Sequence, residues 1–237
     1  MSAPRTVLVT GGNRGIGLAS AQLLADQGHR VAVTARNPET VDDRILSGPC
    51  DQTDPSAVES AFETIEAELG SVEVLVANAG ITRDQLLLRM SDEDFSEVIA
   101  TNLTGSYRMA RRATRTMLRA RWGRLIFVSS VVGLLGSAGQ VNYAASKAGR
   151  VGMARSMARE LGSRSITANI VSPGPVATEM FASLTEEQQS AITAQVPLGR
   201  VAQPDEIAQA IAFLASESAA YITGAVIPID GGLGMGH

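Results

Sequence analysis

A tyrosine and a lysine four residues apart are the side chains of this sequence best suited to acid–base chemistry. Tyr143 and Lys147 lie in the stretch Tyr-Ala-Ala-Ser-Lys, and Lys147 is the only lysine beside 19 arginines. On a helix the two side chains share one face. An ammonium near a phenol is expected to lower the phenol pKa from about 10 towards neutrality. The pair is therefore a candidate proton donor and acceptor, and a solvated helix face that holds one lysine is the alternative.

The hydrophobic pattern predicts the elements that must position these residues. Short apolar runs typical of buried parallel strands alternate with longer helical patterns. Strands are predicted at Thr6–Thr10, Arg30–Thr34, Ile45–Cys50 (the weakest), Val72–Ala77, Leu125–Val128, Ile166–Val171 and Val226–Ile229. Helices are predicted at Gly15–Gln27, Pro55–Leu69, Asp92–Arg119, Asn142–Leu161, Glu186–Thr193 and Pro204–Ala215. The alternation indicates an α/β fold: one Rossmann-type domain over residues 1–237, with a doubly wound parallel sheet of about seven strands and helices on both faces.

The turn after the first strand has the composition of a phosphate-binding loop. Residues 10–17 read Thr-Gly-Gly-Asn-Arg-Gly-Ile-Gly, and a helix follows. Glycines let the backbone approach a pyrophosphate at the helix N-terminus. The spacing Gly-x-x-x-Gly-x-Gly differs from the standard fingerprint, but its place between strand and helix favours a dinucleotide site over a plain turn. The candidate contacts in this loop are Gly11, Asn13, Arg14, Gly15, Ile16 and Gly17.

The end of the second strand indicates which dinucleotide binds. NAD-binding folds usually carry an acidic residue there, which holds the ribose 2′-hydroxyl. This chain has Arg36 instead, and Arg14 in the glycine loop is a candidate second clamp. Because guanidinium groups match phosphate geometry, we expect NADP(H) rather than NAD(H). The alternative is that both arginines are ordinary surface residues.

Composition argues against several other classes of protein. Cys50 is the only cysteine, and His29 and His237 are the only histidines, so neither a histidine-based triad nor a metal site is expected. No apolar run approaches the roughly 20 residues of a membrane span. The chain enters a strand-like run at Thr6, so we expect no signal peptide and a cytoplasmic protein. The net charge of −4 argues against nucleic acid as a partner.

The glycine loop, Tyr143 and Lys147 together resemble the short-chain dehydrogenase/reductase family, over essentially the whole chain. The resemblance implies a catalytic tetrad of Asn102, Ser130, Tyr143 and Lys147. Ser129, which is adjacent to Ser130, could be confused with the catalytic serine. It also implies further cofactor contacts. Asp51 would meet the adenine, and Asn78, Ala79 and Gly80 would support the adenosine side; Pro173, Gly174 and Thr178 would hold the nicotinamide carboxamide.

Within the family, three stretches resemble the bacterial 3-oxoacyl-[acyl-carrier-protein] reductases of type II fatty-acid synthesis, in their actinobacterial form. The stretches are Gly11–Gly17, Asn142–Gly149 and the tail from Tyr221. The resemblance implies that NADPH reduces a 3-oxoacyl thioester to the 3-hydroxyacyl thioester, and the wider tyrosine-to-lysine spacing of the enoyl reductases argues against C=C reduction. A reductase of another carbonyl compound (acetoacetyl-coenzyme A, a quinone or a steroid) stays open. A non-catalytic dinucleotide sensor is disfavoured, because the four tetrad positions are intact.

Arginines crowd the middle of the chain, where no acidic residue occurs between Val98 and Arg159. Those at 108, 112, 115 and 119 recur at helical spacing. They form either a solvated face with some arginines paired to distant acids, or a docking patch for an acidic acyl carrier protein. By resemblance, Arg121 and Arg164 are the docking residues, and the chain forms a homotetramer. Met180, Phe181, Leu184 and Ile192 fit an apolar lid over an acyl chain or ordinary core packing.

The lone lysine yields a direct test. Lys147→Arg keeps the positive charge, but its bulkier planar group should fit neither the phenol nor a ribose, so most of the activity should be lost. The rate of NADPH oxidation measures the loss. A variant close to wild type would refute the argument from the lysine.

Overall fold

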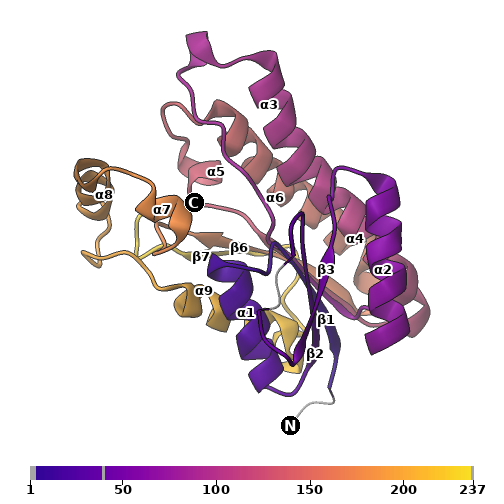
Figure 1. The fold of residues 1–237 in the computed structure, drawn as a ribbon. Helices are drawn as coiled ribbons and strands as arrows, with labels where there is room; N and C mark the ends of the chain where they lie inside the picture. Colours follow the sequence, from indigo (N-terminus) through magenta and orange to yellow (C-terminus); the bar gives the residue numbers. More distant parts are fainter. Residues whose placement is uncertain (1–3, 39–40, 236–237) are drawn as a thin grey trace.

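One parallel sheet organises the molecule, which the computed structural model describes for residues 4–38 and 41–235 (Figure 1). The strand order is β3-β2-β1-β4-β5-β6-β7. The strands are β1 (Thr6–Thr10), β2 (Arg30–Ala35), β3 (Ile45–Pro49), β4 (Val74–Ala77), β5 (Gly123–Val128), β6 (Ile166–Pro173) and β7 (Val226–Ile229). The predicted α/β class and doubly wound parallel sheet are confirmed. His237 lies outside the described residues.

Helices cover both faces of this sheet (Figure 1). On one face α1 (Gly15–Asp26) packs against α9 (Pro204–Ala215). The other face carries α2 (Pro55–Leu69), α4 (Ser106–Ala120) and α6 (Val141–Leu161). Shorter helices are α3 (Asp92–Val98), α5 (Val132–Leu135), α7 (Glu179–Ala182) and α8 (Glu186–Thr193). The sequence pattern does not predict α5 and α7, because four residues are too few to show a helical period.

The apolar strands explain this layering. In β1 the side chains of Val7 and Val9 join the hydrophobic cluster under α1 and α9, whereas Leu8 joins the cluster under α2, α4 and α6. Successive strand residues point to opposite faces, so a strand that is apolar throughout has to be covered on both sides. All five β1 residues are buried accordingly.

The predicted helix Asp92–Arg119 has an internal irregularity. The backbone is α-helical in α3, π-helical over Ile99–Gly105 (η2), and α-helical again in α4. A β-carbon at Gly105 would lie 2.5 Å from the Gln52 side chain, so this turn approaches its neighbour too closely for any larger residue. Hydrophobic periodicity does not reveal a π-helical turn, which is often found at functional sites. Asn102 lies in this segment.

The strand order brings the loops of interest to one edge of the sheet. The chain continues from β1 through β2 to β3 on one side, and β4 returns to pair with β1 on the other. In such sheets ligands bind beyond the carboxyl ends of the strands, at the point where the order reverses. The glycine loop, Asn78, Ser130 and Gly174 follow the carboxyl ends of β1, β4, β5 and β6 respectively.

Candidate active site

Asn78 fixes the shape of the glycine loop. Its Nδ2 donates to the carbonyl oxygens of Thr10 and Gly11, each at 3.0 Å. The Thr10 hydroxyl in turn accepts from the backbone N–H groups of Asn78 and Ala79. A β-carbon at Gly17 would lie 2.2 Å from the Gly11 carbonyl oxygen, so helix α1 must begin with glycine to pack so closely. The loop is therefore held open at the helix N-terminus, where a pyrophosphate charge is favoured.

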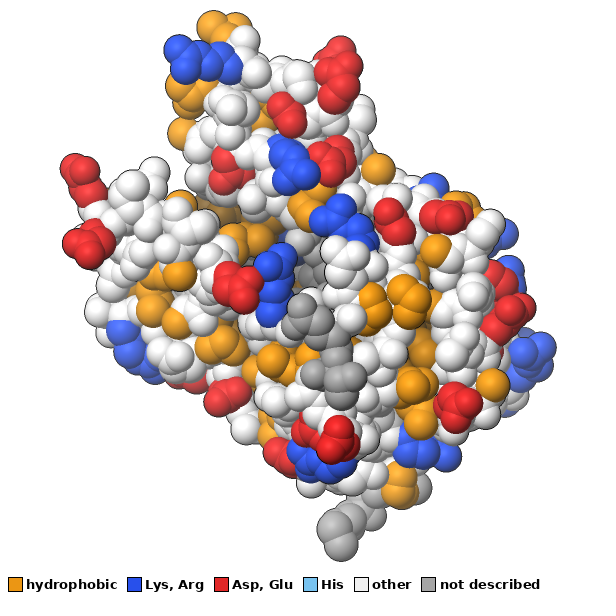
Figure 2. All heavy atoms as spheres, viewed as in Figure 1, with side chains coloured by type: hydrophobic (Ala, Val, Ile, Leu, Met, Phe, Trp, Pro, Cys, Tyr) orange, Lys and Arg blue, Asp and Glu red, His pale blue; other side chains and the backbone are white. Residues whose placement is uncertain are grey.

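A cavity of about 790 Å³ lies between the glycine loop and helix α7. Its lining includes Gly15 and Leu18 from the loop and α1, and Thr178, Glu179 and Phe181 from the segment at α7. Thr178 directly covers the loop, because its Cγ2 would be 3.2 Å from a β-carbon at Gly15. Figure 2 shows a further hollow between the α7–α8 projection and the α3 projection, whereas the lining of the 790 Å³ cavity includes no residue of α3. The cavity also extends along α1 to the start of α9, and no tetrad residue lines it.

Arg14 and Arg36, the two arginines expected to bind the 2′-phosphate, lie in different surroundings. Arg14 donates to the Glu179 carboxylate at 2.7 Å, and both side chains are largely exposed. Arg36 lines a second cavity, of about 410 Å³, with Cys50 and Asp51. Hydrogen bonds from Thr53 hold the pKa of Asp51 below its usual range, with Arg36 as a weaker contributor. The structure therefore places Arg36 beside Asp51, while Arg14 is engaged with the segment that covers the glycine loop.

Asn102 is fully buried at the centre of the π-helical segment. Its Oδ1 accepts from the Ile81 N–H at 2.8 Å, and its Nδ2 donates to the Ile81 carbonyl at 3.0 Å and to Ser146 Oγ at 3.1 Å. Ser146 lies on α6, so these contacts join the segment after β4, the π-helical turn and the helix that carries Tyr143.

Ser129 and Ser130 face different partners. The buried Ser129 hydroxyl donates to the Lys147 backbone carbonyl at 2.9 Å and so ties β5 to α6. The Ser130 hydroxyl instead accepts from the Val132 N–H at 3.2 Å and lies close enough to the Tyr143 phenol to favour its phenolate form by hydrogen bonding, which lowers the Tyr143 pKa. Of the two neighbours, Ser130 is thus the one that could share a carbonyl oxygen with the phenol.

The structure contradicts the expectation that Lys147 lowers the pKa of Tyr143. The ammonium donates to the Val128 carbonyl at 2.9 Å and lies 5.3 Å from the centre of the phenol ring. Burial raises the pKa of Tyr143, and the Arg150 charge and the bond with Ser130 only partly oppose it. Burial also lowers the pKa of Lys147 well below its usual range. The expectation was wrong because desolvation outweighs charge attraction and because the ammonium points to a carbonyl.

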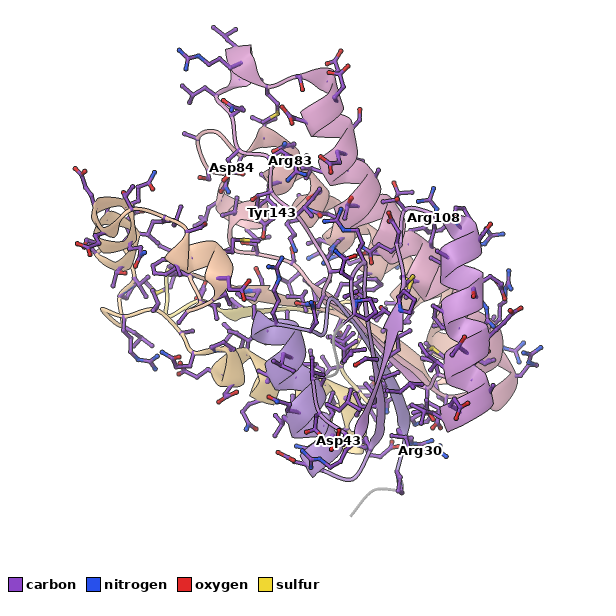
Figure 3. All side chains as sticks on the ribbon, viewed as in Figure 1. Arg30, Asp43, Arg83, Asp84, Arg108 and Tyr143 are labelled. Atoms are coloured by element: carbon purple, nitrogen blue, oxygen red, sulfur yellow. The ribbon has the colours of Figure 1, made fainter. Side chains whose placement is uncertain are left out.

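Two charged residues near the phenol were missed from the sequence. Arg150 is completely buried on α6 and acts electrostatically on both Tyr143 and Lys147. Its spacing of three from Lys147 and seven from Tyr143 could have placed it on the same helix face. Asp84 lies close to Tyr143 (Figure 3) and raises its pKa further. Asp84 follows a loop with no regular pattern, so nothing in the sequence marked it.

The loop after β6 packs against the serine loop. The Pro173 carbonyl accepts from the Val131 N–H at 2.9 Å, and the Gly174 N–H donates to the Ile229 carbonyl at 3.1 Å. A β-carbon at Gly174 would lie 2.8 Å from the Asp230 backbone, so only glycine fits there. Pro173, Gly174 and Ser130 therefore share one rigid wall of the site.

The remaining arginines have varied environments. Arg112 on α4 binds Glu59 and Glu66 of α2, and Arg115 binds Glu59, so these two are paired to distant acids. Arg121 donates to the Ser163 carbonyl at 3.3 Å, which places it beside Arg164. Both precede their strands, β5 and β6, and so lie at the sheet edge opposite the tetrad.

The apolar residues of the proposed lid are not core residues. Met180 is 50% exposed, and Phe181, Leu184 and Ile192 are half-buried. Over residues 4–38 and 41–235, no helix is both long and apolar enough to cross a membrane. The same residues hold no cluster of three or more histidine, cysteine or acidic side chains that could bind a metal.

A glycine loop and a serine–tyrosine–lysine group on one edge of a parallel sheet define a dinucleotide-dependent oxidoreductase of the short-chain type. Residues 11–234 match the family model described as Enoyl-(Acyl carrier protein) reductase. The chain is 54% identical to the 3-oxoacyl-[acyl-carrier-protein] reductase MabA of Mycobacterium tuberculosis, over 98% of this chain and 94% of that protein. It is 46% identical to FabG of Escherichia coli, which bears the same enzyme name, over 98% of both chains. The chain belongs to the short-chain dehydrogenase/reductase family, whose members use a nicotinamide dinucleotide.

Proposed function

We propose that this protein catalyses the NADPH-dependent reduction of a 3-oxoacyl thioester, carried on acyl carrier protein, to the 3-hydroxyacyl thioester of fatty-acid biosynthesis. The supporting observation is that the Ser130 hydroxyl lies close enough to the Tyr143 phenol to lower its pKa, with Lys147 Nζ 5.3 Å from the centre of the phenol ring. This group lies at the sheet edge that also carries the glycine loop. Both relatives named above are 3-oxoacyl-[acyl-carrier-protein] reductases.

The side chains divide the work of the reaction. The bound cofactor supplies the hydride. The Ser130 hydroxyl donates to the ketone oxygen and stabilises the charge that develops on it. Tyr143 then gives its proton to that oxygen. Because burial raises the pKa of Tyr143, the phenol stays protonated near neutral pH, as a proton donor must. Lys147 would hold the ribose hydroxyls, and Asn102 would hold a water through which Tyr143 regains its proton.

The cofactor contacts favour NADPH over NADH. Arg36 stands at the end of β2, where NAD-binding folds usually carry an acid. Arg14 pairs with Glu179 across an exposed contact, and such pairs contribute about 1 kcal/mol at most. A 2′-phosphate could therefore replace the carboxylate at Arg14 at little cost. Gly11, Asn13, Gly15, Ile16 and Gly17 would surround the pyrophosphate, with Asp51, Asn78, Ala79 and Gly80 on the adenosine side and Pro173, Gly174 and Thr178 at the nicotinamide.

Reduction of C=O fits the site better than reduction of C=C. The family model carries the name of an enoyl reductase, whereas the two relatives are carbonyl reductases. Tyr143 and Lys147 are four residues apart, and the enoyl reductases of this pathway use a wider spacing. The Ser130 hydroxyl and the phenol could both reach one ketone oxygen, because Ser130 lies near enough to affect the Tyr143 pKa.

Tyr143→Phe removes the proposed proton donor and little else. Ketone reduction should fall by roughly 10²–10⁴-fold, the usual contribution of a general acid, while the fold and NADPH binding persist. Steady-state rates, circular dichroism and NADPH fluorescence measure the three quantities. Tyr107→Phe, at an exposed tyrosine on α4, is the matched control and should behave as wild type. Substantial turnover in Tyr143→Phe would refute the assignment.

The carrier protein is proposed to dock at Arg121 and Arg164. Both are exposed, and Arg121 bonds to the carbonyl of Ser163, the residue before Arg164, so together they would present a basic surface to an acidic partner. Since β5 separates them from Ser130, a carrier docked there must reach across about 20 Å of strand or serve a neighbouring subunit.

We propose a tetramer of twofold symmetry, supported by the small exposed residues Ala145, Ala148 and Gly152 on α6.

Charge reversal tests the docking surface. Arg121→Glu with Arg164→Glu should raise KM for a carrier-bound 3-oxoacyl substrate roughly tenfold, since like charges now oppose the encounter. The KM for acetoacetyl-coenzyme A should stay near the wild-type value. Arg30→Glu, at an exposed arginine on the same sheet edge, serves as the control. Equal effects on the two substrates would remove the docking interpretation.

A further inference from the structure

Arg150 makes an unusual set of contacts directly behind the site. Its side chain is 0% exposed, and all three guanidinium nitrogens donate to backbone carbonyl oxygens. Nε and Nη2 bind the Asn102 carbonyl at 3.0 and 2.7 Å, Nη1 binds the Ala77 carbonyl at 3.0 Å, and Nη2 binds the Ala79 carbonyl at 2.9 Å. Nη1 also donates to the Val128 carbonyl. One side chain thus satisfies four buried acceptors.

Within the described part of the chain, the charge of this group has no carboxylate partner. None of the ion pairs found among residues 4–38 and 41–235 involves Arg150. A buried ion without a counterion is costly, so carbonyl dipoles must stabilise it here. Burial lowers the pKa of Arg150 to about 10, which still leaves it protonated near neutral pH. A permanent positive charge therefore sits behind the catalytic residues.

The four carbonyls belong to the elements that build the site. Ala77 ends β4, Val128 ends β5, Ala79 lies in the segment after β4, and Asn102 lies in the π-helical turn. The Val128 carbonyl also accepts from the Lys147 ammonium. If Lys147 turns towards a ribose, Val128 keeps a donor in Arg150. The guanidinium thus holds the backbone on either side of Ser130 and Asn102 without depending on the lysine.

Arg150 is also one of the charges that act on the phenol. The groups facing Tyr143 are Lys147 and Arg150 from α6, Ser130 from the loop after β5, and Asp84 from the segment after β4. Burial and Asp84 favour the neutral phenol, whereas Arg150 favours the phenolate. The same charge favours loss of the proton from Lys147. Arg150 therefore acts in one direction on both groups.

We propose that Arg150 is a positioning residue for the reaction: its carbonyl contacts hold Asn102 and the end of β5 in place, and its fixed charge sets the pH range over which Tyr143 exchanges its proton. The proposal rests on the proposed function, in which Tyr143 is the proton donor. It adds a residue whose effect on pH dependence can be measured separately from its effect on the fold.

Arg150→Gln removes the charge and keeps an amide that can still donate to a carbonyl. Without the positive charge, both Tyr143 and Lys147 hold their protons more strongly, so the pKa values of both rise. In the reductive direction Tyr143 works protonated, and the rate falls as pH rises through its pKa. The alkaline limb of the pH–rate profile should therefore move to higher pH by about one unit in the variant.

A matched control separates charge from packing. Ser106 donates to the same Asn102 carbonyl at 2.7 Å but carries no charge. Ser106→Ala should leave the alkaline limb where it is in the wild type, whatever it does to the melting temperature. A second readout is independent of turnover: the phenolate absorbance of Tyr143, obtained by subtracting Tyr143→Phe in each background, should titrate at higher pH in Arg150→Gln.

Each result decides the proposal. The proposal is supported if the alkaline limb of the pH–rate profile and the phenolate titration both move to higher pH in Arg150→Gln. Arg150→Met replaces that variant if Arg150→Gln does not fold. A folded variant with an unmoved limb overturns the proposal, as does a shift of the same size in Ser106→Ala. Failure of both neutral variants to fold would also overturn it, because the side chain would then be a structural support. Absence of wild-type activity on every 3-oxoacyl thioester would instead reject the proposed function.

Discussion

The site depends on one contact, between helix α6 and the carbonyl oxygens at the carboxyl ends of β4 and β5. Lys147 and Arg150 both donate to Val128, and Arg150 also binds Ala77. A buried carbonyl without a donor costs about 1–3 kcal/mol, so these bonds fix the helix against the sheet. Because Tyr143 lies on the same helix, its hydroxyl is brought to Ser130, at the edge where the glycine loop begins α1.

Burial determines how the acid–base pair behaves. The Tyr143 pKa is raised and the Lys147 pKa is lowered, and desolvation is the largest cause of both shifts. The phenol therefore keeps its proton near neutral pH, and in the proposed reaction it would give that proton to the developing alkoxide. The buried charge of Arg150 limits how far the Tyr143 pKa rises, since the phenolate gains from that charge. In the proposed reaction, a ketone oxygen between Ser130 and Tyr143 would thus meet two hydroxyl donors.

The layered fold and the glycine loop could be predicted from the sequence, because strong local patterns indicate both. Apolar strands require covering on both faces, and the glycine turn after β1 marks the loop that Asn78 then holds. Other features depend on partners distant in the chain. The π-helical turn around Asn102 packs closely against Gln52 at Gly105, and the pairing of Arg14 with Glu179 joins residues far apart in the sequence. Arg150 was not singled out among the arginines of the sequence, and the Tyr143 shift was predicted in the wrong direction because burial was left out.

The most direct test of the proposed NADPH-dependent ketone reduction is to measure cofactor oxidation with two substrates. These are a 3-oxoacyl thioester and a 2-enoyl thioester of the same chain length. The account predicts turnover of the 3-oxoacyl thioesters, from acetoacetyl upwards, and none of the enoyl thioesters. NADPH should exceed NADH in kcat/KM by roughly tenfold or more, since charged hydrogen bonds contribute about 1.5–3 kcal/mol. Oxidation that depends on the enoyl thioester, or equal use of NADH, would contradict it.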